Sequence, residues 1–168
     1  ADKSLDEASQ ERGLIALSHF GERLRGLPQD AVRAVATNAL RVAKNASSFL
    51  LRAEAALGFP IEIIAGREEA RLIYIGAVHS LPASDQQRLV FDIGGGSTEF
   101  IIGAGMKPLK LESLFMGCVS YSMRFVPDGR IDKKRFAEAE VAAAREVQPA
   151  INAARADDLS RRRFGTVM

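Results

Sequence analysis

The pattern of apolar and polar positions predicts a chain in which helices and strands alternate. Apolar residues three or four positions apart, bounded by capping residues, glycine or proline, indicate helices. Helices are expected at residues 5–25, 45–57, 67–78, 119–125 and 133–154. Short runs of β-branched and aromatic residues indicate strands. Strands are expected at residues 31–37, 61–64, 89–93, 100–102 and 109–114.

The order of these elements predicts two parts. The first part alternates strands with helices, whereas in the second a three-stranded meander is followed by helices. We therefore expect an α/β protein of two lobes, residues 1–72 and 73–168, with a ligand site in the cleft between them. The first helix is expected to begin at a capping box of Ser4 and Glu7. Pro149 is expected to kink or divide the last helix.

The segment D-I-G-G-G-S-T-E, residues 92–99, ends one expected strand and begins the next. Glycines let backbone N–H groups approach a ligand closely, and successive N–H groups form a nest for anions such as phosphate. Asp92 just before the glycines could hold a metal ion directly or through water, and Glu99 adds a second carboxylate. The segment therefore predicts a site for phosphate and magnesium.

Two familiar nucleotide-binding motifs do not fit this segment. The pattern G-x-x-x-x-G-K-[ST] requires a lysine after the glycines, and none is present. The pattern G-x-G-x-x-G requires a glycine at position 99 and a helix after the turn. A purely structural alternative is a tight hairpin whose glycines serve only the turn, although a two-residue hairpin does not require three of them.

The helix expected from residue 67 begins with two acids, Glu68 and Glu69. Acids in a first turn stabilise a helix by complementing the positive end of its dipole, and this is a sufficient structural role for both. The functional alternative is that one of them acts as a base at a cleft. Because adjacent helical residues point about 100° apart, at most one is expected to face a given ligand.

Composition narrows the class of protein only slightly. The 168 residues are 47% hydrophobic and carry a net charge of +2, which is too small to indicate nucleic acid or a membrane as partner. The single cysteine, Cys118, rules out an internal disulfide, suits a reducing compartment and is expected to be a buried apolar residue. We expect no membrane span and no signal peptide, and hence a cytoplasmic protein.

Four segments, in order, resemble the exopolyphosphatase and guanosine pentaphosphate phosphohydrolase family. The resemblance runs from about Leu5 to Asn152, and Ala65 replaces the serine usual in the second segment. The segments are V-A-T-N-A-L-R at 35–41, I-E-I-I-A-G-R-E-E-A-R-L at 61–72, D-I-G-G-G-S-T-E at 92–99 and M-G-C-V-S at 116–120. The last of these is similar to the bacterial exopolyphosphatase branch.

The resemblance implies an actin-like, sugar-kinase-like (ribonuclease H-like) fold that binds phosphate between two α/β lobes. It implies removal of the terminal phosphate of inorganic polyphosphate with Mg²⁺. By position, Glu69 would be the base that activates water, Asp92 and Glu99 would hold the metal or its water, and Arg41 would bind phosphate from the other lobe. The residues that would cradle the phosphates are Gly94, Gly95, Gly96 and Ser97.

The family pattern also contains two segments that the sequence lacks. A first phosphate loop of D-x-G-S-N-S type has no counterpart, and only residues 165–168 stand where a G-x-S-G-T segment is expected. We therefore expect a fragment of a protein whose full-length form can be a homodimer. Three functions compete: an exopolyphosphatase, a guanosine pentaphosphate phosphohydrolase and a non-catalytic polyphosphate-binding module. Residues 116–120 favour polyphosphate over the nucleotide.

Overall fold

The computed structural model describes residues 3–156. The chain divides into two compact units, residues 1–65 and 66–168, and each is described by itself. The boundary precedes the expected one near Leu72, because the helix that contains Leu72 packs along its length on the sheet of the second unit. Residues 157–168, which include the expected family segment at 165–168, lie outside the described residues.

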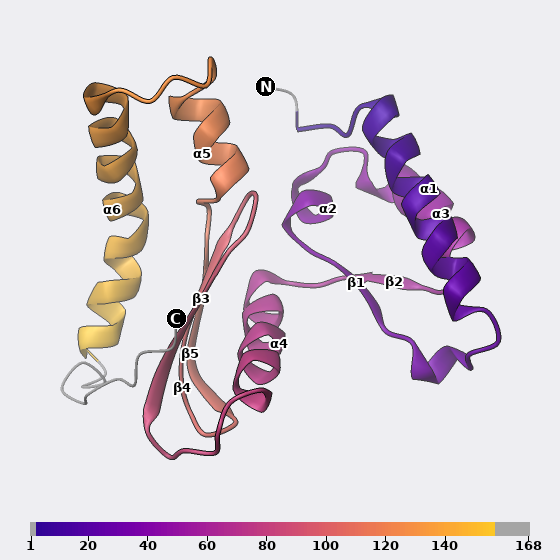
Figure 1. Ribbon diagram of the computed structural model, residues 1–168, viewed down its shortest axis with the longest axis horizontal. Helices are drawn as coiled ribbons and strands as arrows, with labels where there is room; N and C mark the ends of the chain where they lie inside the picture. Colours follow the sequence, from indigo (N-terminus) through magenta and orange to yellow (C-terminus); the bar gives the residue numbers. More distant parts are fainter. Residues whose placement is uncertain (1–2, 157–168) are drawn as a thin grey trace. The chain divides into compact units, whose positions relative to one another are not determined.

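The first unit packs two helices against each other beside a short parallel pair of strands (Figure 1). Its core consists of Phe49, Ala53, Leu57 and Ile61, which Leu14 and Leu17 cover from the first helix. The elements are α1 (Glu7–Leu24), a 3-10 turn (Gln29–Ala31), β1 (Ala34–Ala36), α2 (Asn38–Val42), α3 (Ala46–Leu57) and β2 (Ile61–Ile63).

Two details of this unit correct the sequence-based expectations. Helix α1 is capped by Asp6, whose Oδ1 accepts a hydrogen bond from Ser9 N at 2.8 Å, so the expected capping box at Ser4 does not form. The strand expected at 31–37 is shorter, because a 3-10 turn takes up its first residue.

The second unit places a helix on one face of a three-stranded antiparallel sheet, in the order β3–β4–β5, as expected for a meander. Of the two remaining helices, α6 lies on the other side of the sheet from α4, and α5 lies next to α6 beyond the end of the sheet (Figure 1). The elements are α4 (Gly66–His79), β3 (Gln87–Ile93), β4 (Thr98–Ala104), β5 (Lys107–Leu114), α5 (Cys118–Phe125) and α6 (Lys133–Ala156). Pro149 lies inside α6, which continues past it instead of dividing.

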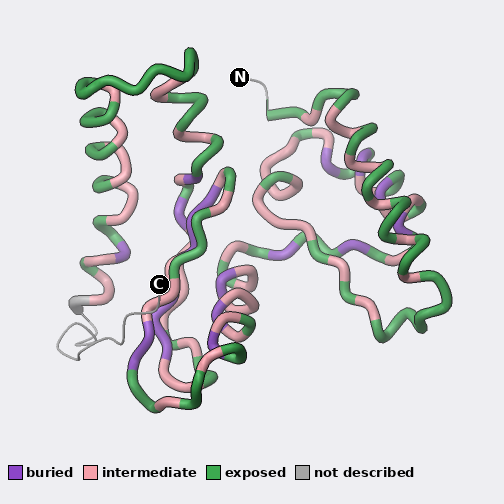
Figure 2. Tube along the Cα trace, viewed as in Figure 1, coloured by how far each residue is buried: buried purple, intermediate pink, exposed green. Residues whose placement is uncertain are grey.

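The strands of this sheet contain both buried and exposed residues (Figure 2). On the α4 face, Val90, Ile101 and Leu111 lie side by side on the three strands and pack against Ala70, Tyr74 and Val78 of α4. On the other face, Phe91 and Ile93 remain 56% and 70% exposed. Since side chains alternate between faces along a strand, this packing identifies the residues that share the α4 face. In the described part of the chain, no helix has the length and hydropathy needed to cross a membrane.

Candidate active site

A row of polar residues crosses the α4 face of the sheet, next to the apolar row. Asp92 lies opposite Glu99, and Glu99 lies opposite Ser113. Asp92, Glu99 and Ser113 each lie two positions along their strand from a member of the apolar row. Their side chains are therefore on the α4 face, like those of Val90, Ile101 and Leu111. The first turn of α4 contributes Glu69, which directly precedes the fully buried Ala70. The fold thus brings together the three carboxylates that the sequence singled out.

Glu99 is buried within this group, with only 1% of the residue exposed. Burial raises the pKa of its carboxyl above the usual range. Hydrogen bonds from the hydroxyls of Ser113 and Ser97 oppose that rise, and the negative charges of Glu69 and Asp92 add to it. The Ser113 Oγ donor lies 2.8 Å from Glu99 Oε1. Both the burial and the neighbouring charges therefore act against ionisation, and the two serines favour it.

The two adjacent acids of α4, Glu68 and Glu69, interact with different residues. Glu68 forms a bidentate ion pair with Arg71, one turn later in the helix. Arg71 Nε and Nη2 donate to Glu68 Oε2 and Oε1, both at 2.7 Å. Glu69 instead interacts electrostatically with Glu99. The expectation that only one of the pair faces the site agrees with this geometry, and the role of Glu69 as a base stays a prediction.

The glycine turn between β3 and β4 is closed by a hydrogen bond from Gly94 N to Ser97 O at 2.9 Å. None of Gly94, Gly95 and Gly96 has a positive φ, so the turn does not need glycine for its backbone conformation. A Cβ on Gly95 would meet only ordinary contact, 3.4 Å from Val119 Cγ2. The purely structural alternative, in which the glycines serve only the turn, is therefore weakened.

The carbonyl groups of the turn point at the first turn of α5. Gly94 O accepts from Cys118 N at 2.9 Å, and Gly95 O accepts from Val119 N and Ser120 N at 2.9 and 3.0 Å. In a planar trans peptide the C=O and N–H groups point in opposite directions. The N–H groups of Gly95 and Gly96 are therefore directed away from α5, and no acceptor for either is recorded among residues 3–156. Two adjacent amides so directed are a candidate anion-binding nest.

Gly117, at the start of α5, lets the glycine turn pack closely against this helix. A Cβ on Gly117 would lie 2.5 Å from the carbonyl carbon and oxygen of Gly95 and 2.6 Å from Gly96 N. A hydrogen bond also joins the start of β4 to the M-G-C-V-S segment, because Thr98 Oγ1 donates to Met116 O at 2.7 Å. The M-G-C-V-S segment thus holds the position of the glycine turn through its backbone.

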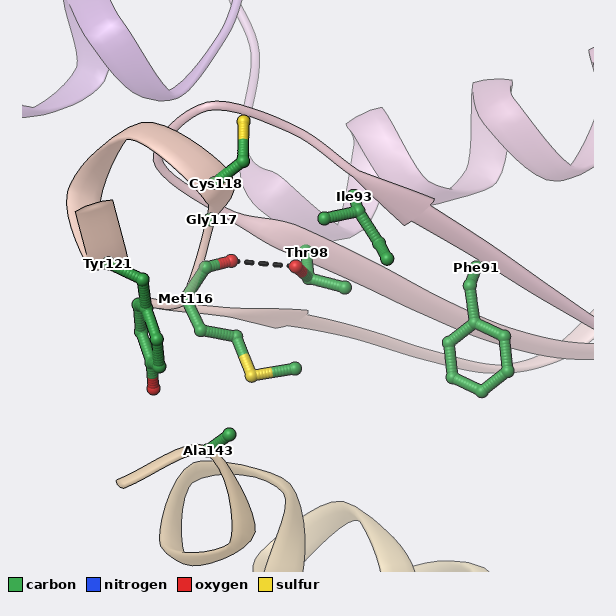
Figure 3. Close-up of a pocket in the computed structure, with 8 residues that line it drawn as sticks. All are labelled: Phe91, Ile93, Thr98, Met116, Gly117, Cys118, Tyr121 and Ala143. Carbon is green, nitrogen blue, oxygen red and sulfur yellow. Dashed lines mark hydrogen bonds between the residues drawn. The ribbon is translucent and has the colours of Figure 1, made fainter. Parts of the chain in front are cut away.

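A hollow of about 510 Å³ lies near the turn but offers different chemistry (Figure 3). Phe91 and Ile93 line it from the sheet, Tyr121 from α5 and Ala143 from α6, and none of the described residues that line it is charged. The exposed Cys118 lies at its edge, contrary to the expectation that this cysteine is buried. Because Phe91 and Ile93 face away from the carboxylates, the hollow is not part of the candidate phosphate site.

Arg41 belongs to the first unit, on α2. Its Nη1 donates to Ile64 O at 2.8 Å, which joins α2 to the residue that follows β2. This bond orients the guanidinium and gives Arg41 a structural role. Its predicted contact with phosphate stays a prediction.

The oxygen ligands of the row fit a magnesium ion in the way that proteins usually bind it. In residues 3–156 no group of three or more His, Cys, Asp and Glu side chains is close enough to hold a metal by itself. Mg²⁺, however, is commonly bound by one or two carboxylates, with water and substrate phosphates completing its shell. Asp92, which is exposed, and Glu99 are opposite each other and form such a pair.

The sequence did not single out Ser113 or the packing role of Gly117. Ser113 lies in a predicted strand, but its place beside Glu99 depends on the register of β5, and β4 and β5 contain an irregularity between Ile102 and Gly103. The role of Gly117 depends on contact with a loop more than twenty residues away. The only available signal was the position of both residues close to the M-G-C-V-S segment.

A nest of turned-out amides beside a row of carboxylates defines a candidate site of the class that binds phosphate with a divalent cation. The particular family follows from comparison with known proteins. The profile of the Ppx/GppA phosphatase family matches residues 1–167, and the chain belongs to this family. The resemblance inferred from the four segments is thereby confirmed.

Solved structures agree with this assignment. An exopolyphosphatase-like protein matches with a TM-score of 0.83 and 28% identity over 89% of this chain and 48% of its own. An exopolyphosphatase from Cytophaga hutchinsonii gives 0.81 and 28% over 91% and 49%. The Aquifex aeolicus Ppx-GppA enzyme gives 0.66 and 29% over 88% and 49%. The predicted α/β fold of this family is confirmed, and the chain spans about half the length of these relatives.

Proposed function

We propose that the protein of which this chain is part hydrolyses the terminal phosphate of inorganic polyphosphate and releases orthophosphate. The observation that carries the proposal is the direction of the Gly95 and Gly96 amides, away from α5, in a turn bordered by Asp92 and Glu99. Phosphoryl transfer needs charge neutralisation, a positioned water and in-line geometry. Two of the similar solved structures are an exopolyphosphatase and an exopolyphosphatase-like protein, which supports polyphosphate as the substrate.

In this proposal each group has one task. The amides of the glycine turn bind the terminal phosphate, with Ser97 contributing its backbone N–H because its hydroxyl donates to Glu99, and Arg41 binds phosphate as a bidentate donor. Glu69 accepts a proton from the attacking water, a role worth about 10²–10⁴-fold in rate. Asp92 and Glu99 would hold Mg²⁺, which would neutralise the phosphate charge.

The direct test measures phosphate release from long polyphosphate with Mg²⁺, comparing the parent chain with Glu69→Gln. Glutamine keeps the size of the side chain and removes the base, so release should fall by about 10²-fold or more. The matched control is Glu68→Gln, the same change at the adjacent residue. It removes the ion pair with Arg71 and should leave release nearly unchanged.

Three results would redirect the proposal. Release that is unchanged in Glu69→Gln would remove Glu69 from the role of base. Binding of polyphosphate without release by the parent would favour the non-catalytic module. Preferential cleavage of guanosine pentaphosphate in a competition assay would favour the nucleotide phosphohydrolase.

A further inference from the structure

Ser113 is the third member of the polar row, and its side chain faces the buried carboxylate. Its Oγ donates to Glu99 Oε1 at 2.8 Å across the β4–β5 ladder. Glu99 is 1% exposed, so water contributes little to holding its carboxylate. The orientation of this carboxylate therefore depends on protein donors.

Within the described part of the chain, two protein donors to Glu99 are recorded, and they come from different elements. Ser97 lies in the glycine turn that is proposed to bind phosphate, whereas Ser113 lies in strand β5, opposite Glu99. A buried carboxylate deprived of a hydrogen-bond donor is destabilised in its charged form. The two neighbouring negative charges, Glu69 and Asp92, increase the need for such donors.

A carboxylate offers about four acceptor positions, and two serine hydroxyls occupy only part of them. A cation or its bound water would take one of the positions that these hydroxyls leave. Residues that hydrogen-bond a metal-ligating group fix its orientation, and their loss commonly weakens metal binding. Ser113 is placed to act in this way without touching the phosphate-binding turn.

We propose that Ser113 is a positioning residue, whose hydroxyl holds the anionic Glu99 carboxylate in the orientation that binds a divalent cation together with Asp92. The inference rests on the proposed function, because that function assigns Asp92 and Glu99 to the cation. Ser113 itself is not proposed to contact the substrate.

The experiment measures Mn²⁺ binding to the chain in the absence of substrate, by the electron paramagnetic resonance signal of free Mn²⁺. Mn²⁺ takes the same oxygen ligands as Mg²⁺. Ser113→Ala should weaken binding by about tenfold to 100-fold. Ser113→Thr keeps the hydroxyl on a residue that suits strands and should restore most of the affinity. Circular dichroism melts show whether each variant is folded.

The matched control is Ser84→Ala in the loop that leads into β3. Ser84 also makes one side-chain hydrogen bond, in which its Oγ accepts from Gln86 N at 3.2 Å, but it lies at the other end of β3 from the glycine turn. Its loss should leave Mn²⁺ affinity unchanged. A double variant gives the specific signature: in a Glu99→Gln background, Ser113→Ala should have no further effect on affinity.

Phosphate release separates this inference from the proposed function. Ser113→Ala should raise the Mg²⁺ concentration needed for half-maximal release and leave the KM for polyphosphate at saturating Mg²⁺ unchanged. If the parent releases no phosphate but Ser113→Ala still weakens Mn²⁺ binding, the proposed function fails and the positioning role stands. If Glu69-dependent release is found and Ser113→Ala binds Mn²⁺ like the parent, the positioning role alone is overturned. It is also overturned if the parent binds no Mn²⁺, or if Ser113→Ala weakens binding equally in the Glu99→Gln background.

Discussion

Asp92 and Glu99 are directly opposite each other in the β3–β4 ladder, yet one carboxylate is exposed and the other is buried. Asp92 lies in the exposed part of edge strand β3, whereas Glu99 lies on the central strand and accepts hydrogen bonds from Ser97 and Ser113. The pair therefore combines an acid in contact with solvent and an acid whose ionisation depends on its protein neighbours.

The first prediction concerns the pH dependence of stability. Because the pKa of Glu99 is raised in the folded chain, the folded form binds its proton more tightly than the unfolded form. The parent should lose stability as the pH rises from the unfolded pKa through the folded pKa, and Glu99→Gln, which cannot ionise, should lose less. Urea unfolding from about pH 4 to about pH 8, with a chelator present, measures this difference. Parallel curves for parent and variant would contradict it.

The second prediction concerns the packing of the glycine turn against Gly117. Gly117→Ala places a methyl group 2.5 Å from Gly95 and must displace the turn, so we expect loss of phosphate release together with a lower melting temperature. Gly76→Ala is the control within the same unit, since a Cβ there meets nothing within 4 Å. Gly76 lies inside α4, where alanine should stabilise the chain by about 0.5–1 kcal/mol. Equal effects of the two substitutions would show that Gly117 has no special role.

The third prediction separates phosphate binding from turn formation. Gly95→Ala introduces no strain in φ and only an ordinary contact with Val119, so the free energy of unfolding should change by less than about 1 kcal/mol. A methyl group at the nest should nevertheless reduce phosphate release by about tenfold or more, which corresponds to about 1.4 kcal/mol. Denaturant unfolding and initial rates measure the two effects. Unchanged release would indicate that the glycines serve the turn alone.

The fourth prediction concerns the core beneath α4. A Cβ on Gly103 would lie 2.2 Å from Cζ of Tyr74, which is fully buried and donates through its hydroxyl to Gly105 O at 2.9 Å. Gly103→Ala should therefore destabilise the chain by about 1–3 kcal/mol through overpacking. The rate per folded molecule should stay near that of the parent, since Gly103 is several residues along β4 from the candidate site. A stability equal to that of the parent, measured by urea unfolding, would show that Tyr74 can move aside.

Much of the local structure could be predicted from the sequence. The meander, the helix that begins near Glu69 and the long last helix follow from periodicity, and the glycine segment is recognisable from its letters. The sequence was less informative about the caps at helix starts, where a side chain can form one of several hydrogen bonds. Asp6 replaced Ser4 as the cap of α1, since its carboxylate accepts from Ser9 N. Asn45 uses its side chain to bridge Leu5 instead of capping α3.

The sequence by itself determined which residue types are present at the candidate site: acids around three glycines, and a second acid pair at a helix start. It also determined membership of the family, because ordered motifs are properties of the chain. Only the tertiary structure decided that Ser113 meets Glu99, that Glu68 pairs with Arg71 and that the amides of Gly95 and Gly96 turn away from α5. The physical reason is that these relationships depend on strand register, helix orientation and the direction of single peptide groups, which packing fixes and local propensity does not.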